Sequence, residues 1–232
     1  VHHAREGRFE QATARFQSAA DALPWAPGLR AMAVASQLSV AGGEEEAVRM
    51  GLDFLRQFPE DRAVAGLLGV AFARAEVPQA RKLLEQGVQA QQPEPDVAYY
   101  LGIVHMREGR SKRARSFFEM ELKHHPKHLK TAHALISVHN GRGAFGRVRD
   151  VATAALLHHG ADEKLLHAQA QAFFNLKAFS DCRLALDLAL IQQPRSSALL
   201  LLDANLLKQE GHTEKGLARF EQAKAAKAAE VP

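Results

Sequence analysis

The sequence predicts an all-α fold built from repeated helical hairpins, and three observations carry that prediction. Small residues recur at intervals of about 34 positions, apolar residues follow each of them at helical spacing, and a helix terminator closes each interval. Of the 232 residues, 47% are hydrophobic and 24% are charged, which is enough apolar material for a large core. No stretch approaches the ~18 to 20 apolar residues that would span a bilayer.

Each interval is anchored by a small residue that we expect at a tight helix contact. These residues are Ala12, Ala47, Ala80, Ala114, Val148, Cys182 and Gly216. The positions four and seven residues later are mostly apolar or small, and these offsets mark one face of a helix. Further along, a proline or glycine ends that helix. The terminators are Pro24, Pro59, Pro93, Pro126, Gly160 and Pro194.

A second helix precedes the small residue, and a glycine loop separates the two helices. The loops carry Gly7, Gly42, Gly109, Gly143 or Gly211. In the preceding helix a large residue stands beside a small one, with an aromatic-sized residue a turn later, as in Leu101, Gly102 and His105. Each interval is therefore one helix-turn-helix hairpin, and short side chains allow neighbouring helices to approach to about 8 to 10 Å.

This pattern predicts one domain, 1–232, divided into consecutive repeats. The predicted repeats are 1–27, 28–61, 62–94, 95–128, 129–162, 163–196 and 197–232. The first repeat is expected to be incomplete, because only 1–6 remain of its first helix. The chain also begins with valine inside a structural unit, which indicates a processed or truncated product.

The pattern is strongest in "YYLGIVHMREGRSKRARSFFEMELKHHP" and "AQAFFNLKAFSDCRLALDLALIQQP". It resembles the tetratricopeptide repeat (TPR) family, whose 34-residue hairpin has Leu-Gly, an aromatic, Gly, Ala, an aromatic, Ala and Pro at these spacings. The resemblance covers essentially the whole chain and is weaker in the fifth repeat, where Gly160 replaces the terminal proline. It implies a right-handed α-α superhelical solenoid of about six and a half repeats.

The resemblance also implies a peptide-binding groove on the concave surface, lined by the first helix of each repeat. The residues predicted to face this groove are Tyr99, Ile103, Met106, Arg107, Lys130, His133, Ser137, Asn140, Lys164, His167, Gln171, Asn175, Asn205 and Lys208. Their amides and cations suit an extended or helical peptide of acidic character. For each residue taken alone, an ordinary solvated position is an open alternative.

Some TPR proteins hold the terminal carboxylate of chaperones with a clamp of Lys, Asn and Arg residues. Lys130 and Lys164 match that clamp, but His133 and His167 stand where its amides or cations belong. We therefore predict a protein or peptide partner, but not that chaperone partnership.

Catalytic and metal sites are not indicated by any motif. A phosphate-binding glycine loop, a His-Glu-x-x-His zinc motif and a nucleophile motif are all missing from the sequence, so we predict no enzyme and no cofactor. The histidine pairs at 124–125 and 158–159 recur at helix ends, where the helix dipole favours a partly charged imidazole, so capping is favoured over metal binding. Cys182, at a tight contact, is expected to be buried with a raised pKa.

A basic stretch raises the alternative of nucleic-acid binding. Between positions 107 and 130 there are eight positive side chains and three negative ones. The positive side chains are Arg107, Arg110, Lys112, Arg113, Arg115, Lys123, Lys127 and Lys130. A nucleic-acid surface would interleave such charges with stacking aromatic residues. Here Phe117 and Phe118 stand together, and Phe118 is a predicted core residue. We therefore predict a solvated helix face and no nucleic-acid partner.

These observations predict a noncatalytic scaffold or adaptor, with assembly of a bacterial multiprotein complex as one role. The alternative is the substrate-recruiting TPR portion of a longer enzyme, such as a kinase or glycosyltransferase. Self-association through the exposed first edge or the alanine-rich tail, 223–232, is a further prediction. Localisation stays open between the cytoplasm and the periplasm, because the first residues carry no targeting signal.

Overall fold

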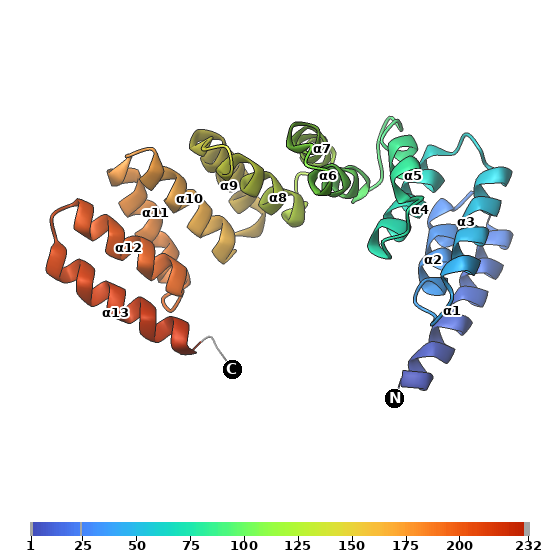
Figure 1. Ribbon diagram of the computed structural model, residues 1–232, viewed down its shortest axis with the longest axis horizontal. Coiled ribbons are helices and arrows are strands. Elements are labelled where there is room, and N and C mark those ends of the chain that lie inside the picture. Colours follow the sequence, from blue (N-terminus) through green and yellow to red (C-terminus); the bar gives the residue numbers. More distant parts are fainter. Residues whose placement is uncertain (1, 24, 230–232) are drawn as a thin grey trace. The chain divides into compact units, whose positions relative to one another are not determined.

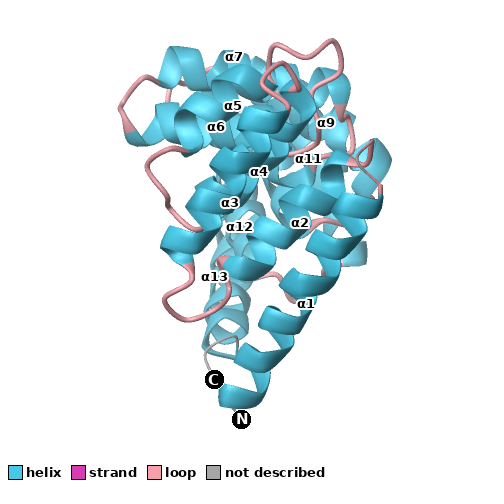
Figure 2. Cartoon of the chain, turned by 90° about the vertical axis from the view of Figure 1, so that its right-hand side faces the viewer, coloured by secondary structure: helices cyan, strands magenta, loops and turns pink. Residues whose placement is uncertain are grey.

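The computed structural model describes residues 2–23 and 25–229, and every regular element within them is an α-helix (Figure 2). The predicted all-α fold is confirmed. The helices of this described part are α1 (His2–Ala22), α2 (Pro27–Gln37), α3 (Glu44–Gln57), α4 (Arg62–Arg74), α5 (Ala80–Gly87), α6 (Val97–Arg107), α7 (Ser111–His124), α8 (Leu129–Asn140), α9 (Phe145–His159), α10 (Glu163–Asn175), α11 (Phe179–Gln192), α12 (Ser197–Gln209) and α13 (Thr213–Ala229). As far as the chain is described, none of them combines the length and hydropathy needed to cross a bilayer.

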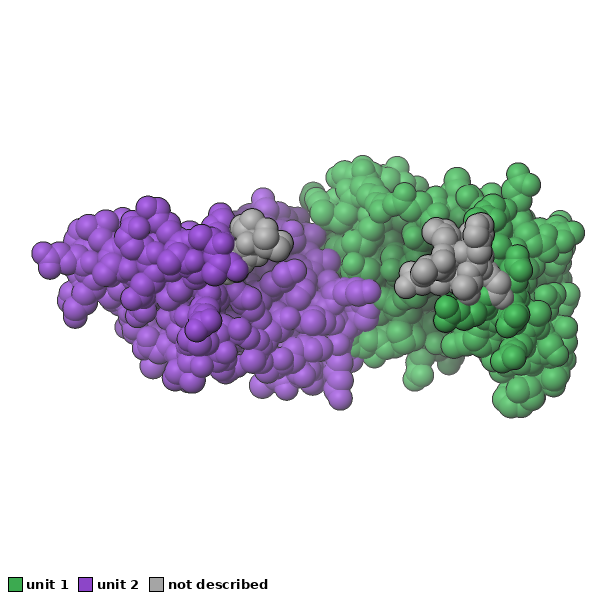
Figure 3. Space-filling view, turned by 90° about the horizontal axis from the view of Figure 1, so that it is seen from below, with its two compact units in different colours: residues 1–125 green, residues 126–232 purple. Residues whose placement is uncertain are grey.

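The chain divides into two compact units, 1–125 and 126–232 (Figure 3). In unit 1, α1 packs on α2, and the hairpins α2–α3, α4–α5 and α6–α7 follow. In unit 2 the hairpins are α8–α9, α10–α11 and α12–α13 (Figure 1). The division into repeats at the predicted boundaries stays a prediction. The grouping of all repeats into a single domain stays a prediction.

The small residues of the repeat are mostly buried between helices within each unit. Those from Ala47 to Gly216 in the predicted series are buried, and Ala12 is half-buried. Gly102 of α6 shows the reason, because a Cβ atom there would lie 2.4 Å from Cε1 of the buried Phe118 on α7. The absence of a side chain is what lets a large aromatic ring fill this space.

The turn inside a hairpin has a recurrent geometry that explains the loop glycines. A residue two or three positions after the first helix has a positive φ, as at Gly109 (72°), Gly143 (66°) and Gly211 (84°). The next amide then donates to a carbonyl five residues earlier, as Arg110 N does to His105 O at 2.8 Å. This pairing is the Schellman motif, in which glycine adopts the left-handed conformation without strain.

Most first helices begin with a side chain that accepts a backbone N–H. Asp61, His128, Asp162 and Ser196 cap α4, α8, α10 and α12 in this way. Helix α6 is different, because its N-cap residue, Asp96, is left-handed (φ 73°) and directs its carboxylate to Arg74 at 2.6 Å. Its cap comes from the neighbouring helix instead.

Glu121 of α7 supplies the cap of α6. Its side chain is 1% exposed, and its Oε1 and Oε2 accept the amides of Asp96 at 2.9 Å and Tyr99 at 3.2 Å. The carboxylate therefore satisfies two N–H groups that have no partner within α6 and lies at the positive end of its dipole. This explains why a charged residue occupies a position that is small or apolar in the other repeats.

One prediction about the start of the chain is wrong. Gly7 does not lie in a loop, because α1 runs without a break from His2 to Ala22. A single glycine inside a helix costs only about 1 kcal/mol, which is too little to force a break without a proline or a capping signal. Val1 and the predicted terminator Pro24 lie outside the described residues.

Candidate functional site

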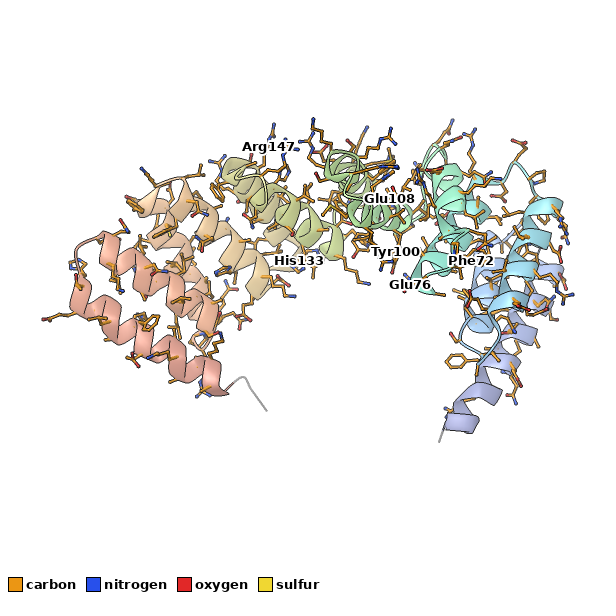
Figure 4. All side chains as sticks on the ribbon, viewed as in Figure 1. Phe72, Glu76, Tyr100, Glu108, His133 and Arg147 are labelled. Carbon is orange, nitrogen blue, oxygen red and sulfur yellow. The ribbon has the colours of Figure 1, made fainter. Side chains whose placement is uncertain are left out.

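A cavity of about 470 Å³ lies between the first helices of two consecutive hairpins in unit 2, α8 and α10. Its wall includes six of the predicted groove residues: His133, Ser137, Asn140, Lys164, His167 and Gln171. Ile136, Ala168 and Ala198 add an apolar surface. The structure thus brings together polar side chains that are up to 38 positions apart, because successive first helices present the same face (Figure 4, His133).

The charges around this cavity are nearly balanced. Lys164 and Glu163 both line it, and His133 Nε2 lies 3.1 Å from Oδ1 of Asp162. Burial alone would raise the pKa of Asp162, but the hydrogen bonds from the Leu165 amide and from His133 outweigh it and hold that pKa below its usual value. Asp162 therefore stays ionised beside His133.

His167 is a half-buried titratable group in the cavity wall. Burial lowers the pKa of His167, and the nearby Glu163 only partly offsets this effect. Its imidazole is therefore neutral near pH 7 and can donate one hydrogen bond and accept another. Together with the amides of Asn140 and Gln171, it suits a polar but uncharged group such as a peptide bond.

The predicted groove residues of α6 divide between two surroundings within unit 1. Ile103 and Arg107 line a cavity of about 300 Å³ against α4 and α5, where Arg107 pairs with Glu76 at 3.0 Å (Figure 4, Glu76 and Tyr100). Tyr99 is not among the residues of this wall. Its ring packs 5.2 Å from Tyr100 and 6.0 Å from Phe118, and burial raises its pKa.

The remaining predicted groove residues do not line the cavities described here. They are Met106, Lys130, Asn175, Asn205 and Lys208, and all of them are exposed. Asn175 accepts a hydrogen bond from Gln171 at 3.3 Å, which links it to the cavity wall. The cavity between α8 and α10 thus holds the largest group of these residues, and their role as a peptide-binding groove stays a prediction.

Sequence reasoning missed a third cavity, of about 620 Å³, in unit 1. It lies between α2 and α4 and is lined mainly by small and apolar residues, among them Ala31, Met32 and Leu67. Small and apolar residues in a sequence are normally interpreted as core residues. The signal that could have found it is their register, because they occupy the face of α2 and α4 that corresponds to the predicted groove on α8 and α10.

Solved structures of MamA have a similar fold. MamA MSR-1 is 20% identical over 72% of this chain and 97% of its own, with a TM-score of 0.59. MamA AMB-1 is 23% identical over 71% of this chain and 98% of its own, also with a TM-score of 0.59. A third structure is MamA from Desulfovibrio magneticus RS-1, from residue 41 to the end. It is 16% identical over 74% of this chain and 98% of its own, with a TM-score of 0.61. No family model and no curated protein matches the sequence.

The similarity to MamA shows the fold of most of the chain, because about seven tenths of it superimposes on nearly the whole of each MamA structure. At this level of identity the groove residues cannot be transferred from MamA. The chemistry of the site therefore depends on the side chains of this chain.

Two histidines outside this cavity, His105 and His125, have structural environments. His125 follows the last residue of α7, and its Nε2 lies 2.9 Å from the Pro93 carbonyl oxygen. His105 is 3% exposed and stacks on Phe117 with ring centroids 5.3 Å apart. Within the described part of the chain, no three His, Cys, Asp or Glu side chains are grouped so that they could hold a metal ion.

Cys182 is buried at the contact between α11 and α10, as its position in the repeat predicts. Its Sγ donates to the Ala170 carbonyl oxygen at 3.3 Å, and burial raises its pKa to about 11. The thiol is therefore protonated, and unreactive, over the whole physiological range.

Stability should fall at alkaline pH because of this thiol. Its pKa is about 9.0 when exposed and about 11 when folded, so the unfolded chain loses its proton first as the pH rises. We expect the free energy of unfolding to drop by about 2 kcal/mol between pH 9 and 11. Urea unfolding at each pH measures the drop. Cys182→Ala, which installs the residue of other repeats, should remove most of it, and an equal drop in that variant would contradict the assignment.

Proposed function

We propose that this chain is a noncatalytic scaffold of the TPR type that binds an extended segment of a partner protein on the first helices of its hairpins. The observation that carries the proposal is the cavity between α8 and α10. Its volume of about 470 Å³ falls in the range of ligand pockets, about 300 to 1,000 Å³. Apolar residues with a few convergent polar groups are the usual lining of such pockets.

The chemistry of the wall favours a polypeptide over a small charged ligand. Ser137, Asn140 and Gln171 offer donors and acceptors for a peptide backbone, while Ile136 and Ala168 offer a surface for an apolar side chain. Lys164 is the group that would favour a partner of acidic character, and Glu163 limits that preference. A scaffold of this kind would hold proteins together in a larger assembly, and bacterial complex assembly is the role that we propose.

Selection from a displayed library of random 12-residue peptides tests the proposal. The combined variant Lys164→Glu, His167→Ala and Gln171→Ala should bind the selected peptides at least ~10-fold more weakly than the unmodified chain, equivalent to about 1.4 kcal/mol. The loss is expected because the variant removes a cation and two hydrogen-bonding groups from one wall of the cavity. Titration by fluorescence anisotropy gives the dissociation constants.

A matched control changes the same residue types elsewhere in unit 2. The variant Lys215→Glu, His212→Ala and Gln209→Ala alters three exposed residues outside the cavity and should leave binding within about twofold. Equal binding by the cavity variant, with its helical circular dichroism intact, would refute the groove. Selected peptides that are acidic and bind more weakly at high salt would support the acidic partner.

A further inference from the structure

Helix α11 exposes three large apolar side chains on its outer face. Leu184, Leu188 and Ile191 are 64%, 61% and 76% exposed, and their spacing places them on one side of the helix. The opposite face is fully buried through Cys182 and Leu186. A helix that is apolar on both faces is typical of a protein interior, yet unit 2 covers only one face of α11.

The repeat itself does not require this apolar stripe. At the corresponding positions α3 carries Arg49, Asp53 and Arg56, and Arg56 pairs with Asp53 at 2.8 Å. In α5 the first two of these positions are Lys82 and Gln86. Polar residues of this kind are what an outer face that contacts only solvent is expected to carry. A contiguous exposed apolar stripe instead marks an interaction surface.

Charged residues stand at both ends of the stripe. Asp181, Leu184, Leu188 and Ile191 are separated by three, four and three positions, which is the spacing of a coiled-coil seam, and Arg195 follows just beyond the end of the helix. Asp181 lies in the first turn of α11 and Arg195 in the turn that follows the helix. Both are exposed, and neither has an ion-pair partner among the described residues.

We propose that this stripe binds the same stripe of a second copy of the chain, with the two α11 helices antiparallel and crossing at Leu188. A two-fold axis at Leu188 brings Asp181 of each copy next to Arg195 of the other, so both charges gain a partner. A parallel arrangement would place like charges together at each end. The charge pattern therefore selects the antiparallel dimer, and the short apolar seam makes it weak and reversible.

Sedimentation equilibrium of the full chain from about 1 µM to about 1 mM tests the proposal. The unmodified chain should show a concentration-dependent monomer–dimer equilibrium, and Leu188→Glu should raise the dissociation constant at least ~10-fold because it places two carboxylates at the two-fold axis. The matched control is Leu157→Glu, which changes a leucine that is 82% exposed at the end of α9. This control should dimerise like the unmodified chain. A chain that is monomeric throughout, or a dimer that survives Leu188→Glu, would overturn the proposal.

Charge reversal tests the antiparallel arrangement. Asp181→Arg and Arg195→Asp should each weaken the dimer several-fold, and the double variant should regain the original affinity because the pairs are restored with their signs exchanged. Additive losses in the double variant would contradict the arrangement. These readouts do not involve the cavity between α8 and α10, so this surface and the peptide groove can fail independently.

Cross-linking gives a second check. In a Cys182→Ala background, Leu188→Cys should form an intermolecular disulfide under mild oxidation, since a residue on a two-fold axis lies opposite its own copy. Leu157→Cys in the same background should form it more slowly. Equal rates for the two cysteines would count against crossing at Leu188.

Discussion

Leucine in place of Gly87 is expected to lower the free energy of unfolding by about 3 kcal/mol. Gly87 ends α5 at the point where its backbone meets that of α4. A Cβ atom there would lie 2.4 Å from the Cα atom and 2.9 Å from the nitrogen of Gly66, and 3.1 Å from Cγ1 of Val97. The obstacle is mainly backbone, which cannot rotate away as a side chain can, so α4 and α5 would have to separate.

Urea unfolding followed by circular dichroism measures this change. Gly87→Ala should be destabilising by less, because one methyl group needs a smaller displacement. The matched control is Gly28→Leu, since a Cβ atom at Gly28 of α2 would meet nothing within 4 Å and leucine favours a helix over glycine. Equal unfolding midpoints for the Gly87 and Gly28 variants would contradict the close contact.

Removing the Glu121 side chain is expected to destabilise the chain by about 2 to 3 kcal/mol. In Glu121→Ala, the amides of Asp96 and Tyr99 would lose their acceptor inside a buried region, and a cavity would replace the carboxylate. A lost hydrogen bond to a charged group costs about 1.5 to 3 kcal/mol, and partial hydration of the cavity limits the sum. The midpoint of urea unfolding again reports the loss.

Two further variants separate capping from loss of volume. Glu121→Gln keeps the size but retains only one acceptor oxygen, so its loss should be smaller than that of alanine. Glu119→Ala removes a glutamate that is 53% exposed on the same helix and should change stability by no more than about 0.5 kcal/mol. A Glu119 loss as large as that of Glu121 would show that the cap contributes little.

Most of the fold could be predicted from the sequence because the repeat places the same contact in successive intervals. The burial of Ala47, Ala114 and Cys182 and the turn at Gly109 follow from the register alone. A prediction that depends on a single residue is less reliable than one that depends on the whole repeat, as Gly7 shows. There a glycine that usually marks a loop lies inside α1, because no second signal ends the helix.

The cap from Glu121 could not be predicted for a different reason. A glutamate at a core position of α7 reads as an exception in the sequence, and its partners lie more than 20 positions away. Local rules search for a cap within three residues of the helix start. Here the local candidate, Asp96, is engaged by Arg74 instead.

The candidate site was predictable where the groove positions are polar. His133 and His167 hold corresponding places on α8 and α10, and both line one cavity. Apolar groove positions are ambiguous, since the residue type of Met32, in the cavity between α2 and α4, does not distinguish it from a core residue, and only its register does. Tyr99 has the register of a groove residue, but its ring packs against Phe118. Sequence spacing alone does not predict this contact.

The cap that Glu121 gives to α6 has a consequence for hydrogen exchange. Amides in the first turn of a helix normally exchange quickly with deuterium because no carbonyl protects them. The Asp96 and Tyr99 amides are held by a side chain of α7, so they exchange only when α7 separates from α6. These two protons therefore report the opening of a single hairpin, which makes its local stability measurable residue by residue.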